Sequence, residues 1–147
     1  MTTIHSAPFS ELDTSLLYAL LRLRVDVFVV EQKAVYPELD GRDTEPGTLH
    51  VWTEDGGRVT GYLRVLSDAD GVARIGRVCT ELSARGTGVG GRLMAAAMEA
   101  IGARESVLDA QTYARDFYAR FGYEDAGAEY LDEDGIPHIP MRRPATP

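Results

Sequence analysis

The stretch Arg85-Gly86-Thr87-Gly88-Val89-Gly90-Gly91 joins an apolar, strand-like segment, Ala73 to Thr80, to an amphipathic helix that begins near Val89. Glycine has no Cβ, so such a loop can bend tightly and bring several backbone N–H groups onto one oxyanion. The first turn of the helix adds unpaired donors and a positive dipole end, and Arg85 can place a guanidinium on the same phosphate. The sequence therefore predicts an anion cradle, against the alternative of a loop that only turns the corner.

Three phosphate-binding motifs compete for this loop. A P-loop is excluded because no Gly-Lys-Ser/Thr ends the run. The dinucleotide pattern G-x-G-x-x-G fits from Gly86, with Asp109 at the distance of a ribose-binding acid, but five residues separate Thr80 from this glycine, and too little chain follows for a second dinucleotide-binding half. The pattern R-x-x-G-x-G, read from Arg85, fits every position. It resembles the pyrophosphate-binding motif of the GCN5-related N-acetyltransferases (GNAT), which hold acetyl-CoA.

Composition is typical of one globular domain, residues 1–147, with 143–147 expected as a frayed tail. The 147 residues are 44% hydrophobic and carry a formal net charge of -8, which disfavours nucleic acid and anionic membranes as partners and favours a cationic acceptor. No N-terminal leader and no membrane-length apolar segment is found, so we expect a cytoplasmic protein. Cys79 is the only cysteine and the three histidines lack metal-ligand spacing, so no disulfide and no metal site is predicted.

Periodicity predicts an α+β fold, a mostly antiparallel sheet with helices on its faces. Asp13 is a candidate N-cap for a first helix whose leucines recur at helical spacing as far as Phe28, and a long acidic loop, with room for a short helix, follows from Glu31 to Gly47. The predicted strands are 4–9, 49–54, 58–66, 73–80, 106–110, 123–131 and 136–142, and the two later helices are 89–101 and 113–121.

The resemblance to the acetyltransferase family, and to its ElaA-like branch, extends over roughly Leu16 to Met141. It rests on six segments that occur in the same order: 27–32 (VFVVEQ), 39–43 (LDGRD), 75–78 (IGRV), 85–90 (RGTGVG), 117–123 (FYARFGY) and 133–138 (EDGIPH). The resemblance implies a sheet whose two central strands splay apart around the acetyl-pantetheine arm. It also implies the cofactor-binding residues: Val78, Cys79 and Thr80 along the pantetheine, Arg85, Gly86, Thr87, Gly88, Val89, Gly90 and Gly91 at the pyrophosphate, and Phe117 and Tyr118 near the thioester sulfur.

Acetyl transfer needs a deprotonated amine, a stabilised oxyanion and a protonated leaving thiolate. The backbone N–H of Val78 is the candidate donor to the oxyanion, since a strand that leaves its neighbour exposes unpaired donors. Tyr118 is the candidate acid for the thiolate, because a phenol with a pKa of about 10 can protonate a thiolate whose conjugate acid has a pKa of about 8.5. Without the resemblance, Tyr118 reads instead as a core aromatic on a helical stripe.

The sequence offers several candidates for the general base. Many members of that family carry a glutamate on the strand that corresponds to Ala73–Thr80, and this chain has none there. The candidates are Glu31, Asp40, His50 and His138, of which His138 has the most suitable ordinary pKa; each also reads as a solvated loop charge or a packing residue. Cys79 permits an acetyl-cysteine mechanism, but a small buried residue is the favoured interpretation.

The predicted function is transfer of acetyl from acetyl-CoA to a primary amine, of a small molecule or a peptide, by direct attack in a ternary complex. Glu31, Asp40 and Asp43, in the acidic loop, are the predicted acceptor-binding residues, against the alternative of a merely solvated loop. Two alternative functions are kept: a non-catalytic sensor of acetyl-CoA or a nucleotide, and a dinucleotide-dependent oxidoreductase, which the spacing of the glycines favours less. The oligomeric state stays open, a homodimer included.

Overall fold

The first half of the sheet grows from the hairpin that Asp55-Gly56-Gly57 predicts. The computed structural model describes all 147 residues. Strands β2 (Leu49–Asp55) and β3 (Arg58–Ser67) pair antiparallel across Gly56 and Gly57, whose φ angles of 60° and 78° are those of a type I′ turn. Strand β1 (Thr2–Pro8) pairs with β2, and β4 (Ala73–Thr80) pairs with β3, so β1 to β4 form an antiparallel half-sheet.

The second half of the sheet consists of β5 (Ser106–Gln111), β8 (Pro137–Arg143) and the two short strands β6 (Glu124–Asp125) and β7 (Tyr130–Leu131), which both pair with β8. The predicted continuous strand 123–131 was therefore wrong. Its ladder to β8 lapses between β6 and β7, opposite Pro140, which has no N–H to donate. The expectation of a frayed end at Arg143 was also wrong, because Arg143 pairs with Ser106.

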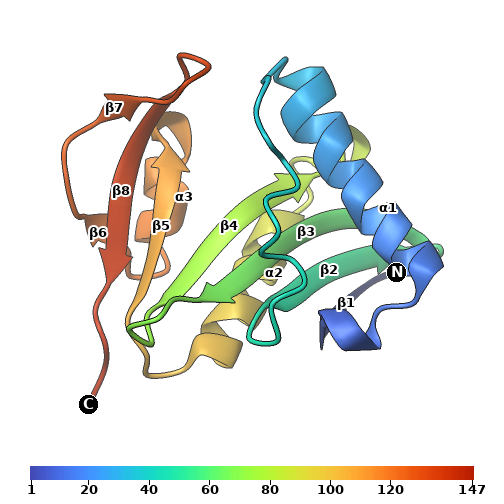
Figure 1. Cartoon of the computed structure of the whole chain (residues 1–147), viewed down its shortest axis with the longest axis horizontal. Helices are drawn as coiled ribbons and strands as arrows, with labels where there is room; N and C mark the ends of the chain where they lie inside the picture. The colour runs from blue at the N-terminus through green and yellow to red at the C-terminus, as the bar shows by residue number, and fades with distance from the viewer.

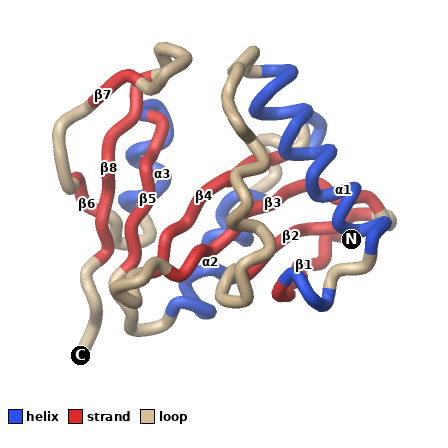
Figure 2. The backbone as a smooth tube through the Cα atoms, in the orientation of Figure 1, coloured by secondary structure: helices blue, strands red, loops and turns tan.

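Only two residue pairs, Ala73 with Ser106 and Arg74 with Val107, join the halves, in parallel, and beyond them β4 and β5 diverge (Figures 1 and 2). A β-bulge bends β4 at this place: its register against β3 shifts between Gly76 and Cys79, and Arg77 has a left-handed φ of 56°. The eight-stranded sheet has the order β1-β2-β3-β4-β5-β8-β6, with β7 also paired to β8, and is therefore the predicted mixed sheet with splayed central strands.

Helices α1 (Thr14–Val25) and α2 (Val89–Ile101) lie on opposite faces of the first half-sheet (Figure 1). Neighbouring residues of β3 show why: Tyr62 packs in a cluster with residues of α1, whereas Leu63 packs in the main core with residues of α2. Asp13 caps α1 as predicted, accepting a hydrogen bond of 2.7 Å from the Leu16 N–H.

Two segments next to the cleft depart from regular α-helix. Residues Asp26–Glu31 continue α1 with wide π-type turns, so that the Gln32 N–H donates to the Val27 carbonyl, 3.1 Å away. The predicted helix 113–121 is shorter than expected: α3 spans Arg115–Ala119 and follows a 3₁₀ turn, Thr112–Ala114. Of the predicted acidic loop, Glu31 belongs to the π-type turns, and the rest contains no helix. No helix of the chain has the length and apolar character needed to cross a bilayer.

Candidate functional site

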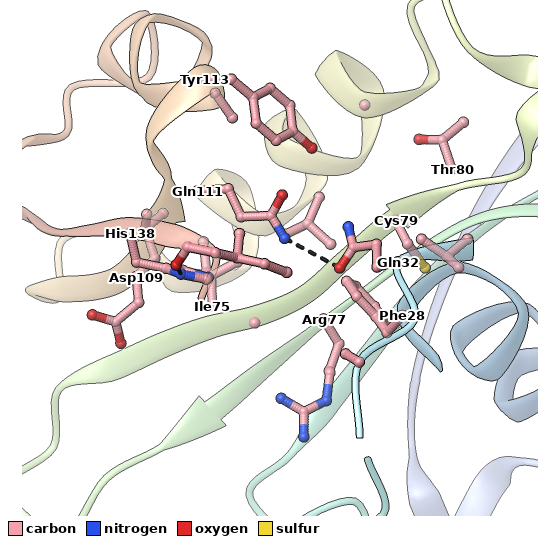
Figure 3. Close-up of a pocket in the computed structure, with 18 of the residues that line it drawn as sticks. Phe28, Gln32, Ile75, Arg77, Cys79, Thr80, Asp109, Gln111, Tyr113 and His138 are labelled. Carbon is pink, nitrogen blue, oxygen red and sulfur yellow. Dashed lines mark hydrogen bonds between the residues drawn. The ribbon is translucent and has the colours of Figure 1, made fainter. Parts of the chain in front are cut away.

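A cleft of about 1350 Å³ opens where β4 and β5 diverge. Its walls come from the ends of these strands, the π-type turns after α1, the glycine-rich loop, α3 and the turn between β7 and β8. It brings together most of the predicted site residues: Glu31, Asp40, Val78, Cys79, Thr80, Arg85, Gly86, Gly88, Val89, Gly90, Gly91, Phe117, Tyr118 and His138. Figure 3 shows its centre, with side chains from both half-sheets facing one another across the gap.

The glycine-rich loop presents unpaired backbone donors at one end of the cleft. The first bond of α2 runs from the Arg92 N–H to the Gly88 carbonyl, so the N–H groups of Val89, Gly90 and Gly91 have no partner within the helix, and no side chain caps it. Gly86 and Gly88 have left-handed φ angles of 78° and 86°, and a Cβ built on either would meet nothing within 4 Å. The space over this loop is open to an anion.

Thr87 differs from its neighbours in the loop. Its hydroxyl donates to the Ala84 carbonyl, and the residue does not line the cleft. The Thr87 side chain thus supports the turn that precedes α2. Only its backbone is placed to take part in an anion cradle.

Arg85 and Glu31, which are 54 residues apart in the chain, form a two-pronged ion pair at the edge of the cleft. Arg85 Nη1 and Nη2 lie 2.6 and 2.7 Å from the two Glu31 carboxylate oxygens, and Arg85 Nε donates to the Thr80 carbonyl at 3.1 Å. The hydrogen bonds from Arg85 lower the pKa of Glu31, which makes this carboxylate a weaker base than an ordinary glutamate.

Tyr118 is buried in the main core and also lines the cleft. Its ring meets Phe117 edge-on, with centroids 5.1 Å apart, and Tyr123 at 6.5 Å. Burial raises the pKa of the Tyr118 phenol well above its usual value, so the hydroxyl keeps its proton at neutral pH. Tyr118 is therefore a core aromatic that also lines the cleft and carries a protonated hydroxyl.

Cys79 lies among the side chains that α1 packs against the sheet and is 5% exposed. Burial raises the pKa of its thiol, so it stays protonated and a poor nucleophile. These surroundings match the interpretation of Cys79 as a small core residue.

His138 lines the cleft on the opposite side, on β8, with its ring stacked on Tyr130 at 5.7 Å. Its Nδ1 lies 2.8 Å from the Ile136 carbonyl oxygen, which can only accept, so Nδ1 carries a proton in the neutral ring. The lone pair of the neutral imidazole is then on Nε2. His138 therefore offers a base nitrogen in a residue of the cleft wall.

The acidic loop differs most from expectation, because arginines neutralise it. Asp43 is 7% exposed, accepts hydrogen bonds from Arg24 at 2.8 Å and Arg64 at 3.1 Å, and does not line the cleft. The prediction that Asp43 binds the acceptor was therefore wrong, because buried arginines neutralise its carboxylate inside the fold. Asp40 does line the cleft, but Arg64 binds both its carboxylate oxygens, at 2.9 and 2.6 Å.

His50 is also removed from the list of candidate bases. It is 1% exposed, with Nε2 3.0 Å from the Asp43 carbonyl and Nδ1 2.6 Å from the Tyr62 hydroxyl, so both ring nitrogens have partners. Burial lowers the pKa of His50 and keeps the ring neutral. It holds the acidic loop against the sheet.

Sequence reasoning missed two features of the site. The carboxamides of Gln32 and Gln111 meet across the cleft at 3.3 Å (Figure 3), and no local pattern marks either residue. Arg24 is 1% exposed on the buried side of α1 and binds Glu38 at 2.7 Å as well as Asp43. An arginine at the helical spacing of Leu20 and Val27 was the one available signal that buried acids must exist.

Comparisons with known proteins agree with this geometry. The acetyltransferase (GNAT) domain family matches residues 22–144. A UPF0039 protein of Mycobacterium tuberculosis is 49% identical over 140 residues, covering 92% of this chain and 89% of its own. The crystal structure of Escherichia coli ElaA superposes with a TM-score of 0.91 at 36% identity, and an acyl-CoA N-acyltransferase from Pseudomonas aeruginosa with 0.90 at 38% identity; each match covers 97% of this chain and 99% of the other. The chain therefore belongs to the GCN5-related N-acetyltransferase superfamily, in its ElaA-like branch.

Proposed function

We propose that this protein is an enzyme that transfers an acetyl group from acetyl-CoA to a primary amine by direct attack in a ternary complex. One observation carries the proposal: a single cleft between splayed strands holds an uncapped helix N-terminus, a protonated tyrosine and a histidine with a free ring nitrogen. The similarity to an acyl-CoA N-acyltransferase at 38% identity supports the same class of donor substrate.

The chain's own groups fit acetyl-CoA from one end of the cleft to the other. The unpaired N–H groups of Val89, Gly90 and Gly91, with the open backbone at Gly86 and Gly88, suit a pyrophosphate, and Arg85 adds a fixed positive charge. The edge of β4 that diverges from β5, with cleft residues Val78, Cys79 and Thr80, would pair with the amides of the pantetheine arm. Phe117 and Tyr118 would flank the sulfur.

The chemistry then divides among three groups. The amine nitrogen attacks the thioester carbon, and the Val78 N–H donates to the oxygen that becomes negative. When the C–S bond breaks, Tyr118 gives its proton to the departing sulfur. His138 Nε2 takes the proton that the attacking nitrogen loses, directly or through a water molecule. His138 then releases this proton to solvent, and the Tyr118 phenolate regains one from solvent, so that both groups return to their starting states.

The acceptor is an amine of a small molecule or a peptide. Glu31 and Asp40 are the two carboxylates of the predicted set that line the cleft. Arg64 binds both oxygens of Asp40, whereas the ion pair of Glu31 is solvent-exposed, so Glu31 is the carboxylate that would contact the amine before its deprotonation. As the general base, His138 is favoured over Glu31, because the hydrogen bonds from Arg85 lower the pKa of Glu31.

A two-stage experiment tests this function. Thermal shifts with acetyl-CoA, CoA, NAD, NADP and ATP identify the ligand, since one at 100 times its Kd adds about 2.7 kcal/mol of stability. Release of the CoA thiol is then followed with a panel of amines. Turnover with an amine supports the proposal. Binding of acetyl-CoA without turnover on any amine would make the protein a sensor, and a shift with NAD alone would contradict the site assignment.

A further inference from the structure

Each of the three nitrogens of the Arg85 guanidinium makes a hydrogen bond within the protein. Two of its nitrogens bind the Glu31 carboxylate and the third donates to the Thr80 carbonyl. Yet Arg85 begins the glycine-rich loop, beside the unpaired N–H groups of α2, where an incoming anion has to bind. The Glu31 carboxylate thus holds the charge that an anionic ligand would use.

Glu31 begins a short segment, residues 31–35, that crosses the cleft by three contacts with three different elements. Glu31 binds Arg85 in the glycine-rich loop, Gln32 accepts a hydrogen bond from Gln111 at the end of β5, and the Val35 N–H donates to Asp134 in the β7–β8 turn at 3.1 Å (Figure 3 shows the glutamine pair). If the Glu31–Arg85 ion pair opens, the segment that contacts the other two elements of the cleft wall is affected directly.

We propose that Glu31 is an internal competitor for Arg85, which the pyrophosphate of CoA displaces on binding; the inference rests on the proposed function. One planar guanidinium fork can bind one anion in the two-pronged geometry, whether carboxylate or phosphate. The Glu31–Arg85 pair is solvent-exposed, with side chains 45% and 37% exposed, so it is weak enough to be exchanged.

The exchange couples the two substrates. Once Arg85 binds phosphate, the Glu31 carboxylate is released in the cleft wall without its cation, and it becomes available to an ammonium group of the acceptor. The acceptor site is then complete only in the CoA-bound protein. When CoA leaves, the Glu31 carboxylate pairs with Arg85 again and occupies its phosphate-binding fork.

The test is a double-mutant cycle, with the Kd of CoA measured by calorimetry for wild type, Glu31→Gln, Arg85→Ala and the double variant. Removing the competitor should tighten CoA binding about two- to five-fold, the factor expected from freeing an exposed ion pair. Arg85→Ala should weaken binding, and in that background Glu31→Gln should bring no gain. The KM for the amine should rise in Glu31→Gln, because the variant lacks the carboxylate that contacts the amine. A loss of structure alone would not combine a higher KM for the amine with tighter CoA binding.

Glu133→Gln is the matched control. Glu133 is an exposed cleft residue outside the proposed machinery, and its neutralisation changes the net charge equally. If Glu133→Gln tightens CoA binding as much as Glu31→Gln does, the effect is general repulsion between the acidic cleft and CoA, and the exchange is refuted. The exchange is also refuted if Glu31→Gln still tightens CoA binding in the Arg85→Ala background. Wild-type protein that binds CoA, with no gain in Glu31→Gln, refutes the exchange and spares the proposed function. Wild-type protein that does not bind CoA refutes both.

Discussion

Tyr118→Phe gives the most direct test of the proposed acid. The substitution removes one hydroxyl and leaves the ring, so the edge-on contacts with Phe117 and Tyr123 are kept. If the hydroxyl protonates the thiolate, kcat should fall by about 10²-fold or more, the usual effect of losing a general acid. That factor corresponds to about 2.7 kcal/mol of lost transition-state stabilisation. The Kd of CoA should hardly change, because the backbone and Arg85 carry the binding.

The assay measures kcat by thiol release at saturating amine, together with the free energy of unfolding in denaturant. Tyr123→Phe is the matched control, because Tyr123 is also a buried tyrosine, but its hydroxyl is bonded to Ser106 at 2.7 Å and does not line the cleft. It should lose about 1 kcal/mol of stability for the broken hydrogen bond and retain its kcat. Burial raises the pKa of Tyr118, so wild-type kcat should show no loss from its ionisation up to about pH 10, the ordinary pKa of a phenol.

The reasoning is refuted if Tyr118→Phe turns over at the wild-type rate and loses only stability. Tyr118 would then be a core aromatic that happens to line the cleft, and the thiolate would leave without a proton or take one from water.

Four further changes test other parts of the site. Gly91→Val should weaken CoA binding at least ten-fold in calorimetry, because the added side chain stands at the unpaired N–H groups of the cradle. The melting temperature should stay within a few degrees, since Gly91 is helical and a Cβ there meets nothing within 4 Å. Unchanged affinity would exclude the cradle. Asp43→Asn should cost about 3 kcal/mol of unfolding free energy and leave amine kinetics intact, because it strips a buried arginine of a partner. Burial acts to raise the pKa of Asp43, but Arg24 holds it below its usual value. The ionised Asp43 therefore stabilises the fold above about pH 4, the ordinary pKa of aspartate, and this stabilisation is lost as the pH falls further. The free energy of unfolding should consequently fall less steeply with acid in the variant. Cys79→Ala should keep near-normal turnover, and an isolable acetylated Cys79 would overturn direct transfer. His138→Gln should lower kcat about 10²-fold, whereas an unaltered kcat would point to another base.

Local chemistry was enough to predict most of the secondary structure. The pair Gly56-Gly57 specifies a two-residue turn by itself, Asp13 specifies the start of α1, and the strand at 73–80 was predicted with the observed bounds. The glycine-rich loop also acts locally, since three successive helix N–H groups must be unpaired wherever a helix begins without a cap. Each of these features depends on residues within a few positions of one another, which is the range that sequence patterns describe.

The failures at 123–131 and in the acidic loop have a different cause. Whether β7 continues from β6 depends on Pro140 in another strand, and whether Asp43 is a free charge depends on Arg24 and Arg64, which are 19 and 21 residues away. An acid in a loop has the same local sequence whether solvent or an arginine satisfies it.

The tertiary structure alone decided how the site is assembled. It placed Glu31 on Arg85 across 54 residues and Gln32 on Gln111 across 79, and it opened β4 from β5 after two paired residues. The sequence alone determined most of the elements and the glycine-rich loop with its uncapped helix, because backbone geometry and capping are short-range effects. The partners of the buried charges, and the cleft itself, came from the packing of both half-sheets against their helices, because a buried ionised group needs an opposite charge.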